Sequence, residues 1–140
     1  MPKPELVYVT EIRTTPEQLW QALTDPEFTQ RYWYGTRIES TFAVGAPLKM
    51  VKQGGAAPDT GVILVADKPR TLSFSWHIAW GDMAKERDSR ATFTIEPLPG
   101  GMVKLTVTHD DLEEGGAVMQ AMQNGWKGIL AGLKTMLEGE

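Results

Sequence analysis

Apolar and polar side chains alternate along much of this chain, which is the pattern of strands that bury one face. The clearest stretch is residues 71–80, in which every second residue is apolar and large. Those positions are Leu72, Phe74, Trp76, Ile78 and Trp80. The same reasoning predicts seven strands, over residues 5–13, 36–41, 48–53, 61–66, 71–80, 90–96 and 102–109. Because short turns join most of them, we predict an antiparallel meander with one apolar and one polar face.

Two short helices are predicted between the first and second strands. Thr15 can cap the first helix, Pro16 suits its first turn, and Pro26 disfavours helical backbone at the residue before it. Asp25 can then cap a second helix that runs roughly to residue 32. Three adjacent aromatic side chains, at residues 32–34, cannot all face one core. We therefore expect at least one of them to be exposed or to lie at the mouth of a cavity.

The C-terminal stretch, residues 117–137, has the three- and four-residue spacing of an amphipathic helix. Its apolar positions are Met119, Met122, Trp126, Ile129, Leu130, Leu133, Met136 and Leu137. A second stripe consists of small residues, Ala121, Gly125, Gly128 and Gly132. Each interior glycine costs a helix about 1 kcal/mol relative to alanine, so we expect bulk to be unfavourable along this stripe. Either another backbone approaches closely there or the stripe borders an open space.

Length and composition fit one domain spanning residues 1–140. The apolar fraction of 41% and the charged fraction of 23% are those of an ordinary globular protein. Because 18 acidic residues outnumber 14 Lys and Arg residues, we expect no nucleic-acid partner and no anionic membrane surface. The sequence contains no cysteine, no apolar signal segment and no long apolar run, so a cytoplasmic protein is expected.

The order of these elements, together with several local motifs, resembles the Bet v 1-like, START-related (SRPBCC) superfamily. The motifs are TPEQLWQALTDP at residues 15–26, WYG at 33–35, GVILVADKPRTLSFSW at 61–76, LTVTH at 105–109, GW at 125–126 and LAGLK at 130–134. Within that superfamily the chain is most similar to the branch named after the activator of Hsp90 ATPase homologue 1. The resemblance covers nearly the whole chain. It implies an α+β helix-grip fold, in which a seven-stranded curved antiparallel sheet wraps around a long C-terminal helix.

That fold implies a cavity between the concave face of the sheet and the C-terminal helix. Its expected lining is Trp20, Phe28, Trp33, Phe74, Trp76, Ile78, Phe93, Val107, His109, Met119, Met122 and Trp126. One hypothesis is a pocket for a small hydrophobic or aromatic ligand, because methionines adapt to varied shapes and aromatic side chains bury much area. The alternative is that the same side chains fill a dry core. The glycine stripe and the fold lead us to favour the pocket.

His109 is the candidate for chemistry, because it has the inward parity of its strand and Asp110 follows it. It could orient a polar ligand group or act as a general base. The alternative, which we favour, is a histidine near the strand end that hydrogen-bonds locally or reaches solvent. His77 has the outward parity, and no HExxH spacing occurs, so we expect no metal site. Since phosphate-binding glycine loops and nucleophile motifs are also absent from the sequence, no cofactor is expected.

An acidic run precedes the C-terminal helix and consists of Asp110, Asp111, Glu113 and Glu114. It is either a contact surface for a protein partner or a source of negative charge that stabilises the helix N-terminus. We favour the second interpretation.

Three functions follow as hypotheses. The leading one is a non-enzymatic protein, monomeric or homodimeric, that binds a small hydrophobic molecule in the cavity. The second, implied by the family name, is a chaperone-associated or stress-response interaction protein that uses the Trp33–Tyr34 pair and the acidic run as contact surfaces. The third is an enzyme of the cyclase, dehydratase or hydrolase kind found elsewhere in the superfamily, which would use His109 together with Asp110 or with a water in the cavity.

Overall fold

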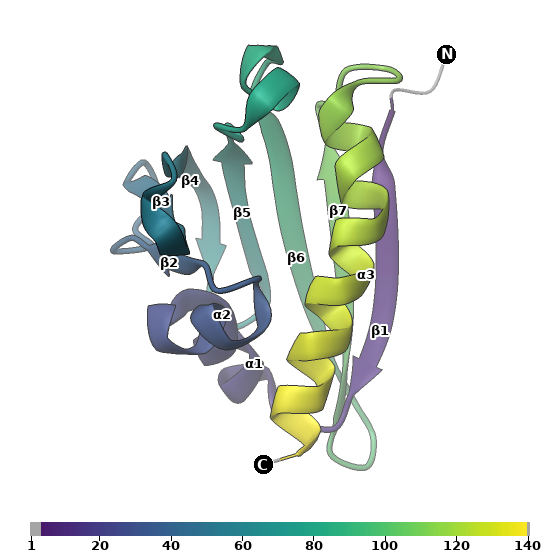
Figure 1. Cartoon of the computed structure of the whole chain (residues 1–140). Coiled ribbons are helices and arrows are strands. Elements are labelled where there is room, and N and C mark those ends of the chain that lie inside the picture. The colour runs from purple at the N-terminus through teal and green to yellow at the C-terminus, as the bar shows by residue number, and fades with distance from the viewer. Residues whose placement is uncertain (1–3, 140) are drawn as a thin grey trace.

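A curved antiparallel sheet wraps around the C-terminal helix α3 (Ala117–Glu138) in the computed structural model, which describes residues 4–139 (Figure 1). Its strands are β1 (Leu6–Ile12), β2 (Arg37–Glu39), β3 (Pro47–Val51), β4 (Asp59–Asp67), β5 (Thr71–Trp76), β6 (Ser89–Leu98) and β7 (Met102–Asp110). They form a 7-stranded sheet in the order β1-β7-β6-β5-β4-β3-β2. This arrangement confirms the predicted helix-grip fold. Residues 1–3 and 140 of the predicted domain lie outside the described residues.

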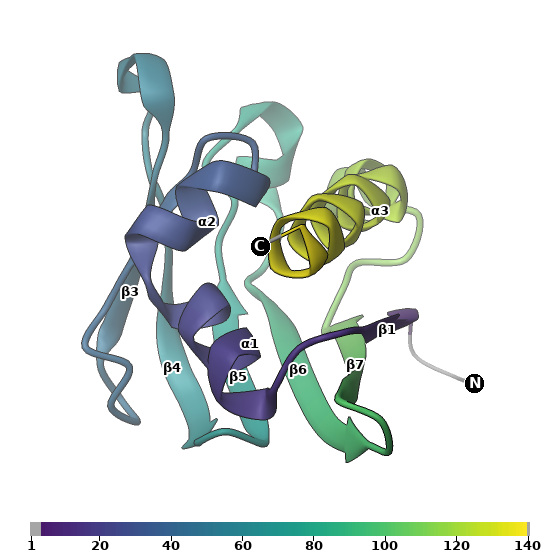
Figure 2. The same ribbon diagram turned by 90° about the horizontal axis from the view of Figure 1, so that it is seen from below.

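The helices lie on the concave side of the sheet (Figure 2). They are α1 (Pro16–Thr24), α2 (Pro26–Tyr32) and α3, and two short 3-10 helices, η1 (Gln53–Gly55) and η2 (Gly81–Lys85), lie between strands. The Tyr8 hydroxyl of β1 donates to the Gln123 carbonyl of α3 at 2.7 Å, which ties this edge strand to the helix. Within residues 4–139, none of the helices has both the length and the hydropathy needed to cross a lipid bilayer.

Alternation along β6 and β7 separates a buried face from a face that stays partly exposed. The buried cross-strand pairs are Ala91–His109, Phe93–Val107 and Ile95–Leu105. The opposite face carries Thr92, Thr94, Thr106 and Thr108, each partly exposed. Since successive strand residues point to opposite faces, this register directs the apolar side chains towards α3.

The predicted starts of the two short helices are confirmed. The Thr15 side chain accepts the Gln18 backbone N–H at 3.1 Å, and the Asp25 carboxylate accepts the Glu27 N–H at 2.9 Å. A proline occupies the first turn of each helix, where its missing N–H leaves no bond unmade. Both helices therefore begin where local hydrogen bonding favours it.

The strand predicted over residues 71–80 is wrong at its C-terminal end, because β5 ends at Trp76. Beyond it, the Ala79 N–H donates to the side-chain carboxylate of Asp59 in β4 at 2.9 Å and not to the backbone of that strand. The chain therefore leaves the sheet. Trp80, which the alternation assigned to the apolar face, is 65% exposed.

The glycine stripe of α3 allows close packing and does not border an open space at its centre. A Cβ atom at Gly128 would overlap the Tyr34 hydroxyl, and a Cβ atom at Gly132 would lie 3.2 Å from the Cβ of Tyr32. Of the two readings of the stripe, close approach is therefore the correct one at these positions. The stripe gives no support to a cavity there, contrary to our expectation.

The N-terminus of α3 is stabilised by a carboxylate from a distant loop. Glu86 accepts the backbone N–H groups of the first two residues of α3, at 2.5 and 3.3 Å. In the acidic run, Asp110 pairs with Arg90 at 2.6 Å, and Glu113 accepts the Arg87 N–H at 2.8 Å. The fold thus supplies the cap from Glu86, while two carboxylates of the acidic run bind the Arg90 side chain and the Arg87 backbone.

Candidate functional site

Aromatic side chains fill the centre of the space between the sheet and α3. Those that pack ring against ring are Trp33, Phe74, Trp76, Phe93, His109 and Trp126, which we call the aromatic cluster. Neighbouring ring centroids lie between 5.3 and 6.5 Å apart, mostly in tilted or T-shaped contacts. Each of these residues is at most 4% exposed. The centre of the molecule is therefore a packed core.

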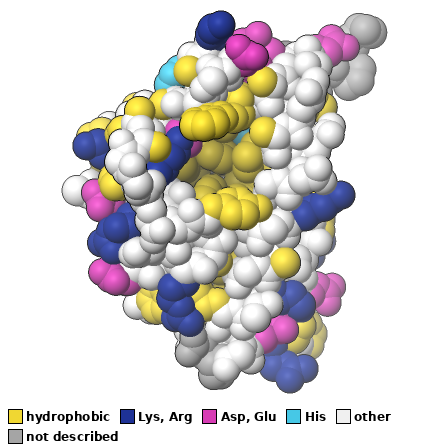
Figure 3. Space-filling view, in the orientation of Figure 1, with side chains coloured by type: hydrophobic (Ala, Val, Ile, Leu, Met, Phe, Trp, Pro, Cys, Tyr) yellow, Lys and Arg dark blue, Asp and Glu magenta, His cyan; other side chains and the backbone are white. Residues whose placement is uncertain are grey.

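An open cavity of about 300 Å³ lies beside the aromatic cluster, between α3, the α2–β2 turn and η2. Four of the residues predicted from the sequence lie in its wall, namely Trp33, Trp76, Ile78 and Met122. The prediction did not include the other wall residues, which are Tyr34, Thr36, Lys52, Gln53, Asp59, Trp80, Met83, Ala121 and Ile129. Figure 3 shows the cavity as a hollow with hydrophobic side chains at its floor and a basic side chain at its edge.

The other residues of the predicted lining lie outside this wall. Trp20 and Val107 are buried in the core, as are the remaining members of the aromatic cluster. Phe28 lies beside Leu137 near the C-terminal end of α3. Met119 lies on the side of α3 that faces the start of β1, next to Glu5. These residues, all predicted to line one cavity, thus lie in three different places: in the core, near the C-terminal end of α3, or beside the start of β1.

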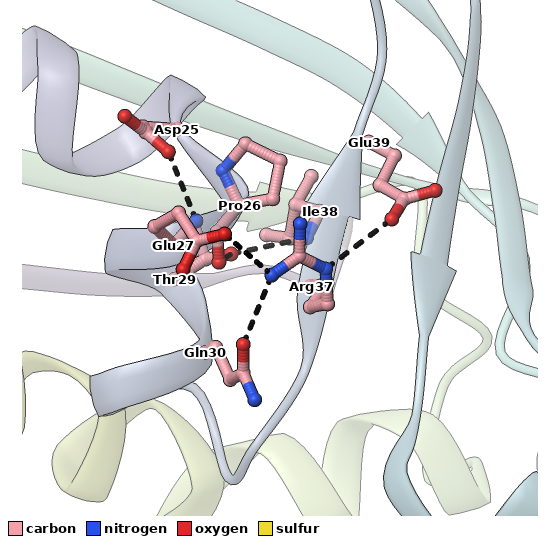
Figure 4. Close-up of polar contacts among 8 residues, drawn as sticks. All are labelled: Asp25, Pro26, Glu27, Thr29, Gln30, Arg37, Ile38 and Glu39. Carbon is pink, nitrogen blue, oxygen red and sulfur yellow. Dashed lines mark hydrogen bonds and ion pairs between the residues drawn. The ribbon is translucent and has the colours of Figure 1, made fainter.

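The turn between α2 and β2 forms one side of the cavity and is held from outside by polar contacts (Figure 4). Thr29 is fully buried, and its hydroxyl accepts the Ile38 backbone N–H at 3.0 Å. Arg37 donates to Gln30 at 3.0 Å and to Glu27 at 3.2 Å. These bonds join α2 to β2 and hold the intervening turn against α3.

Tyr34 bridges this turn and α3 at the edge of the cavity. Its φ of 51° is in the left-handed region, which costs a non-glycine residue of order 1 kcal/mol. Its hydroxyl donates to the Gly125 carbonyl at 3.1 Å, although the residue is 68% exposed. The expectation that one member of the aromatic run would be exposed is confirmed, since Tyr32 and Trp33 are buried.

An ion pair between Lys52 and Asp59 supplies the charged groups of the cavity wall. The two charged groups lie 2.6 Å apart, with Lys52 Nζ on Asp59 Oδ1. Asp59 is 4% exposed and also accepts hydrogen bonds from Trp76 Nε1 at 3.0 Å and from the Ala79 N–H at 2.9 Å. Three donors therefore hold one buried carboxylate at the end of the aromatic cluster.

The sequence contained a signal for this pair that the prediction did not use. Lys52 continues the inward alternation of Leu48 and Met50, and Asp59 is the register partner of Met50 in the β3–β4 pair. A pattern of apolar residues alone does not reveal the pair, because both of these inward positions carry a charge.

Two hydrogen bonds hold His109 neutral inside the aromatic cluster. Trp126 Nε1, which can only donate, donates to His109 Nδ1 at 3.0 Å. The ring proton must then be on Nε2, which donates to Ser89 Oγ at 2.7 Å. Burial lowers the pKa of His109 to about 4, against the smaller opposing effect of Asp110. Since both ring nitrogens are engaged and His109 lies outside the cavity wall, the geometry does not place it as a general base for a ligand in the cavity.

A curved sheet that grips a C-terminal helix defines the class of Bet v 1-like proteins. The model of the family described as activator of Hsp90 ATPase homolog 1-like protein matches residues 13–138, so this chain belongs to that family. Comparison with curated proteins gave no match.

Several solved structures share the fold. A protein from Mesorhizobium loti is 25% identical, with a TM-score of 0.83 and 96% of each chain covered. An HSP90 activator from Plasmodium falciparum is 22% identical, with a TM-score of 0.74 and 95% of each chain covered. The Aha1 dimer from Colwellia psychrerythraea is 20% identical, with a TM-score of 0.77 and 96% of each chain covered. At the last two identities, the similarity concerns the fold alone.

Proposed function

We propose that this chain binds a small hydrophobic or aromatic molecule in the cavity between α3 and η2. The observation that carries the proposal is the wall, which is mainly aromatic and aliphatic and is open to solvent on one side. Its volume of about 300 Å³ is at the lower end of the range typical of small-molecule sites, so the ligand would be small. Trp33 and Trp76 are fixed by a T-shaped contact at 5.9 Å, so little ordering of the wall is needed on binding.

Burial of apolar surface sets the scale of affinity for such a ligand. A molecule that loses about 200 Å² of apolar area gains roughly 5 kcal/mol, at about 25 cal/mol per Å². Before the costs of association, this corresponds to a dissociation constant on the order of 0.2 mM. A screen must therefore reach about millimolar concentrations, and tighter binding requires polar contacts in addition.

Replacing Ala121 by Phe is expected to weaken binding by at least about tenfold, because the added ring occupies space that the ligand needs. Ala121 is an exposed wall residue on α3, so the ring can enter the cavity without displacing a core side chain. Asn124→Phe is the matched control, since Asn124 is exposed on the same helix and lies outside the wall. Aromatic metabolites and short-chain lipids are screened by thermal shift and tryptophan fluorescence, and hits are titrated against all three proteins.

Two results would contradict this proposal. One is the lack of any stabilisation or fluorescence change across the screen with the wild-type chain. The other is a set of hits that bind the Ala121→Phe variant as tightly as the wild type, because such compounds would occupy another surface.

A second candidate function is contact with a protein partner of the Hsp90 type. Two exposed aromatic residues at the cavity edge, Tyr34 and Trp80, support it, because aromatic side chains are enriched at the centres of protein interfaces. Membership of the family, and the HSP90 activator from Plasmodium falciparum among the similar structures, make Hsp90 the partner to test.

For this function, Trp80→Ala is expected to weaken Hsp90 binding by about tenfold or more and to reduce stimulation of its ATPase activity accordingly. Val44→Ala is the control, because Val44 is an equally exposed apolar residue outside the cavity wall. Purified Hsp90 from several sources is assayed for ATP turnover with each variant. A wild-type chain that neither binds Hsp90 nor changes its turnover would remove this candidate.

A further inference from the structure

Lys52 gives the cavity a cationic group with unused hydrogen-bonding capacity. A lysine ammonium carries three N–H donors. Within residues 4–139, the contact described for this ammonium is the one to Asp59 at 2.6 Å. The Lys52 side chain is 25% exposed and lies in the cavity wall, so its other donors are accessible to a ligand. The exposed amide of Gln53 lies in the same wall.

Asp59, in contrast, offers little to a ligand. Its carboxylate has about four lone-pair sites. Lys52, Trp76 Nε1 and the Ala79 N–H each occupy one of them, and the residue is 4% exposed. Lys52 and Asp59 are the charged residues of the described wall. Of the two charged groups, the one with capacity left over is therefore the cationic donor, which calls for an acceptor on the ligand.

We propose that the ligand is a small aromatic carboxylate, with its ring against Trp33 and Trp76 and its carboxylate on the Lys52 ammonium. This inference rests on the proposed function of the cavity and names its ligand class. Trp33 and Trp76 both lie in the cavity wall with their rings crossing at 68°, and an aromatic ligand packs favourably on indole rings in tilted or T-shaped contacts.

A carboxylate is favoured over a neutral acceptor for two reasons. Either acceptor would receive a charge-assisted hydrogen bond from the Lys52 ammonium, but only a carboxylate adds the Coulomb attraction between two opposite charges. Asp59 already balances the charge of Lys52, so a ligand carboxylate gains from the ammonium only where the remaining N–H donors point. This requirement fixes the orientation of the ligand. The net charge of -4 on the chain does not draw anions in from a distance, so any preference for an acid must come from Lys52 itself.

The test compares two probes of nearly identical shape, a naphthalene carboxylate and the corresponding naphthalene carboxamide, by isothermal titration calorimetry. The wild-type chain is expected to bind the carboxylate about tenfold more tightly than the carboxamide. The double variant Lys52→Met/Asp59→Asn removes both charges together, so no buried carboxylate is left without its counter-ion. It is expected to lose the preference for the carboxylate and to bind the carboxamide within about twofold of the wild type.

Lys49→Met is the matched control. Lys49 lies in β3, three residues before Lys52, and is exposed on the outward face, so its loss removes one positive charge and is expected to keep the acid preference. Equal affinities of the wild type for both probes would overturn the proposed ligand class. An acid preference that survives in the double variant would do the same. In either case the cavity would still bind ligands, which separates this failure from that of the proposed function. Binding of neither probe would also overturn the ligand class. The broad screen with Ala121→Phe would then show, independently of these probes, whether the cavity binds any small molecule.

Discussion

Replacing Trp126 by Ala is expected to lower the free energy of unfolding by about 4 kcal/mol, as is typical of a fully buried large aromatic residue. Trp126 has no exposed surface and contacts the rings of Trp33, Trp76, Phe93 and His109. Its removal leaves a large void where α3 crosses the sheet, and it also leaves His109 Nδ1 without its donor. Urea denaturation followed by circular dichroism measures the loss.

The chain supplies its own control for this experiment. Trp80→Ala removes the same side chain from an exposed position, and the expected change in stability is within about 0.5 kcal/mol. Trp126→Phe keeps much of the ring volume but removes the hydrogen bond to His109, so an intermediate loss is expected. If Trp126→Ala and Trp80→Ala have similar effects, the aromatic cluster does not form the packed core described above.

The free energy of unfolding is expected to fall by about 3 kcal/mol as the pH is lowered from about 6.5 to about 4, through the titration of His109 alone. Burial lowers the pKa of His109 to about 4 in the folded chain, whereas the ordinary value is 6.5. Between these values the unfolded chain binds a proton on this histidine that the folded chain does not. Stability must therefore rise with pH across this window. The contribution of His109 is complete above about 6.5 and is lost as the pH falls towards 4.

Carboxylates titrate in the same range, so the prediction is tested by difference. His109→Asn retains an acceptor for Trp126 Nε1 but cannot titrate, and its stability is expected to depend less steeply on pH than that of the wild type. His77→Asn, at a partly exposed histidine near Asp88, is the control for the exchange of a histidine for an asparagine as such. Parallel curves for the wild type and His109→Asn would show that His109 does not titrate as a buried neutral group.

Much of the fold was predictable because its determinants are local. Thr15 and Asp25 each bind a backbone N–H within their own first turn, so the sequence alone placed the starts of both short helices. The alternation in β6 and β7 predicted which residues face inward, since strand geometry ties parity to the buried face. In β5 the same alternation predicts the inward side chains correctly up to Trp76, where the strand ends. Its end depends on Asp59, which binds the Ala79 N–H from another strand.

The candidate site was predictable only in part, for the same reason. Parity and helical spacing indicated that Trp76, Ile78 and Met122 point towards the interior, and these residues do lie in the cavity wall. Neither pattern distinguishes a side chain that fills the core from one that borders a cavity. Trp126 follows Met122 by four residues on the same helix, yet it is fully buried in the aromatic cluster.

The sequence by itself determined the strands, the helix starts and the inward faces, because those depend on neighbours a few residues apart. The tertiary structure alone decided which distant groups meet. The β3–β4 pairing brings Lys52 next to Asp59, the loop after β5 carries Glu86 to the first N–H groups of α3, and the α2–β2 turn lays Tyr34 on the helix. The last two contacts join residues whose separation in space is fixed only once the helix has packed into the sheet. The position of the cavity, between packed aromatic rings and a single ion pair, follows from that packing.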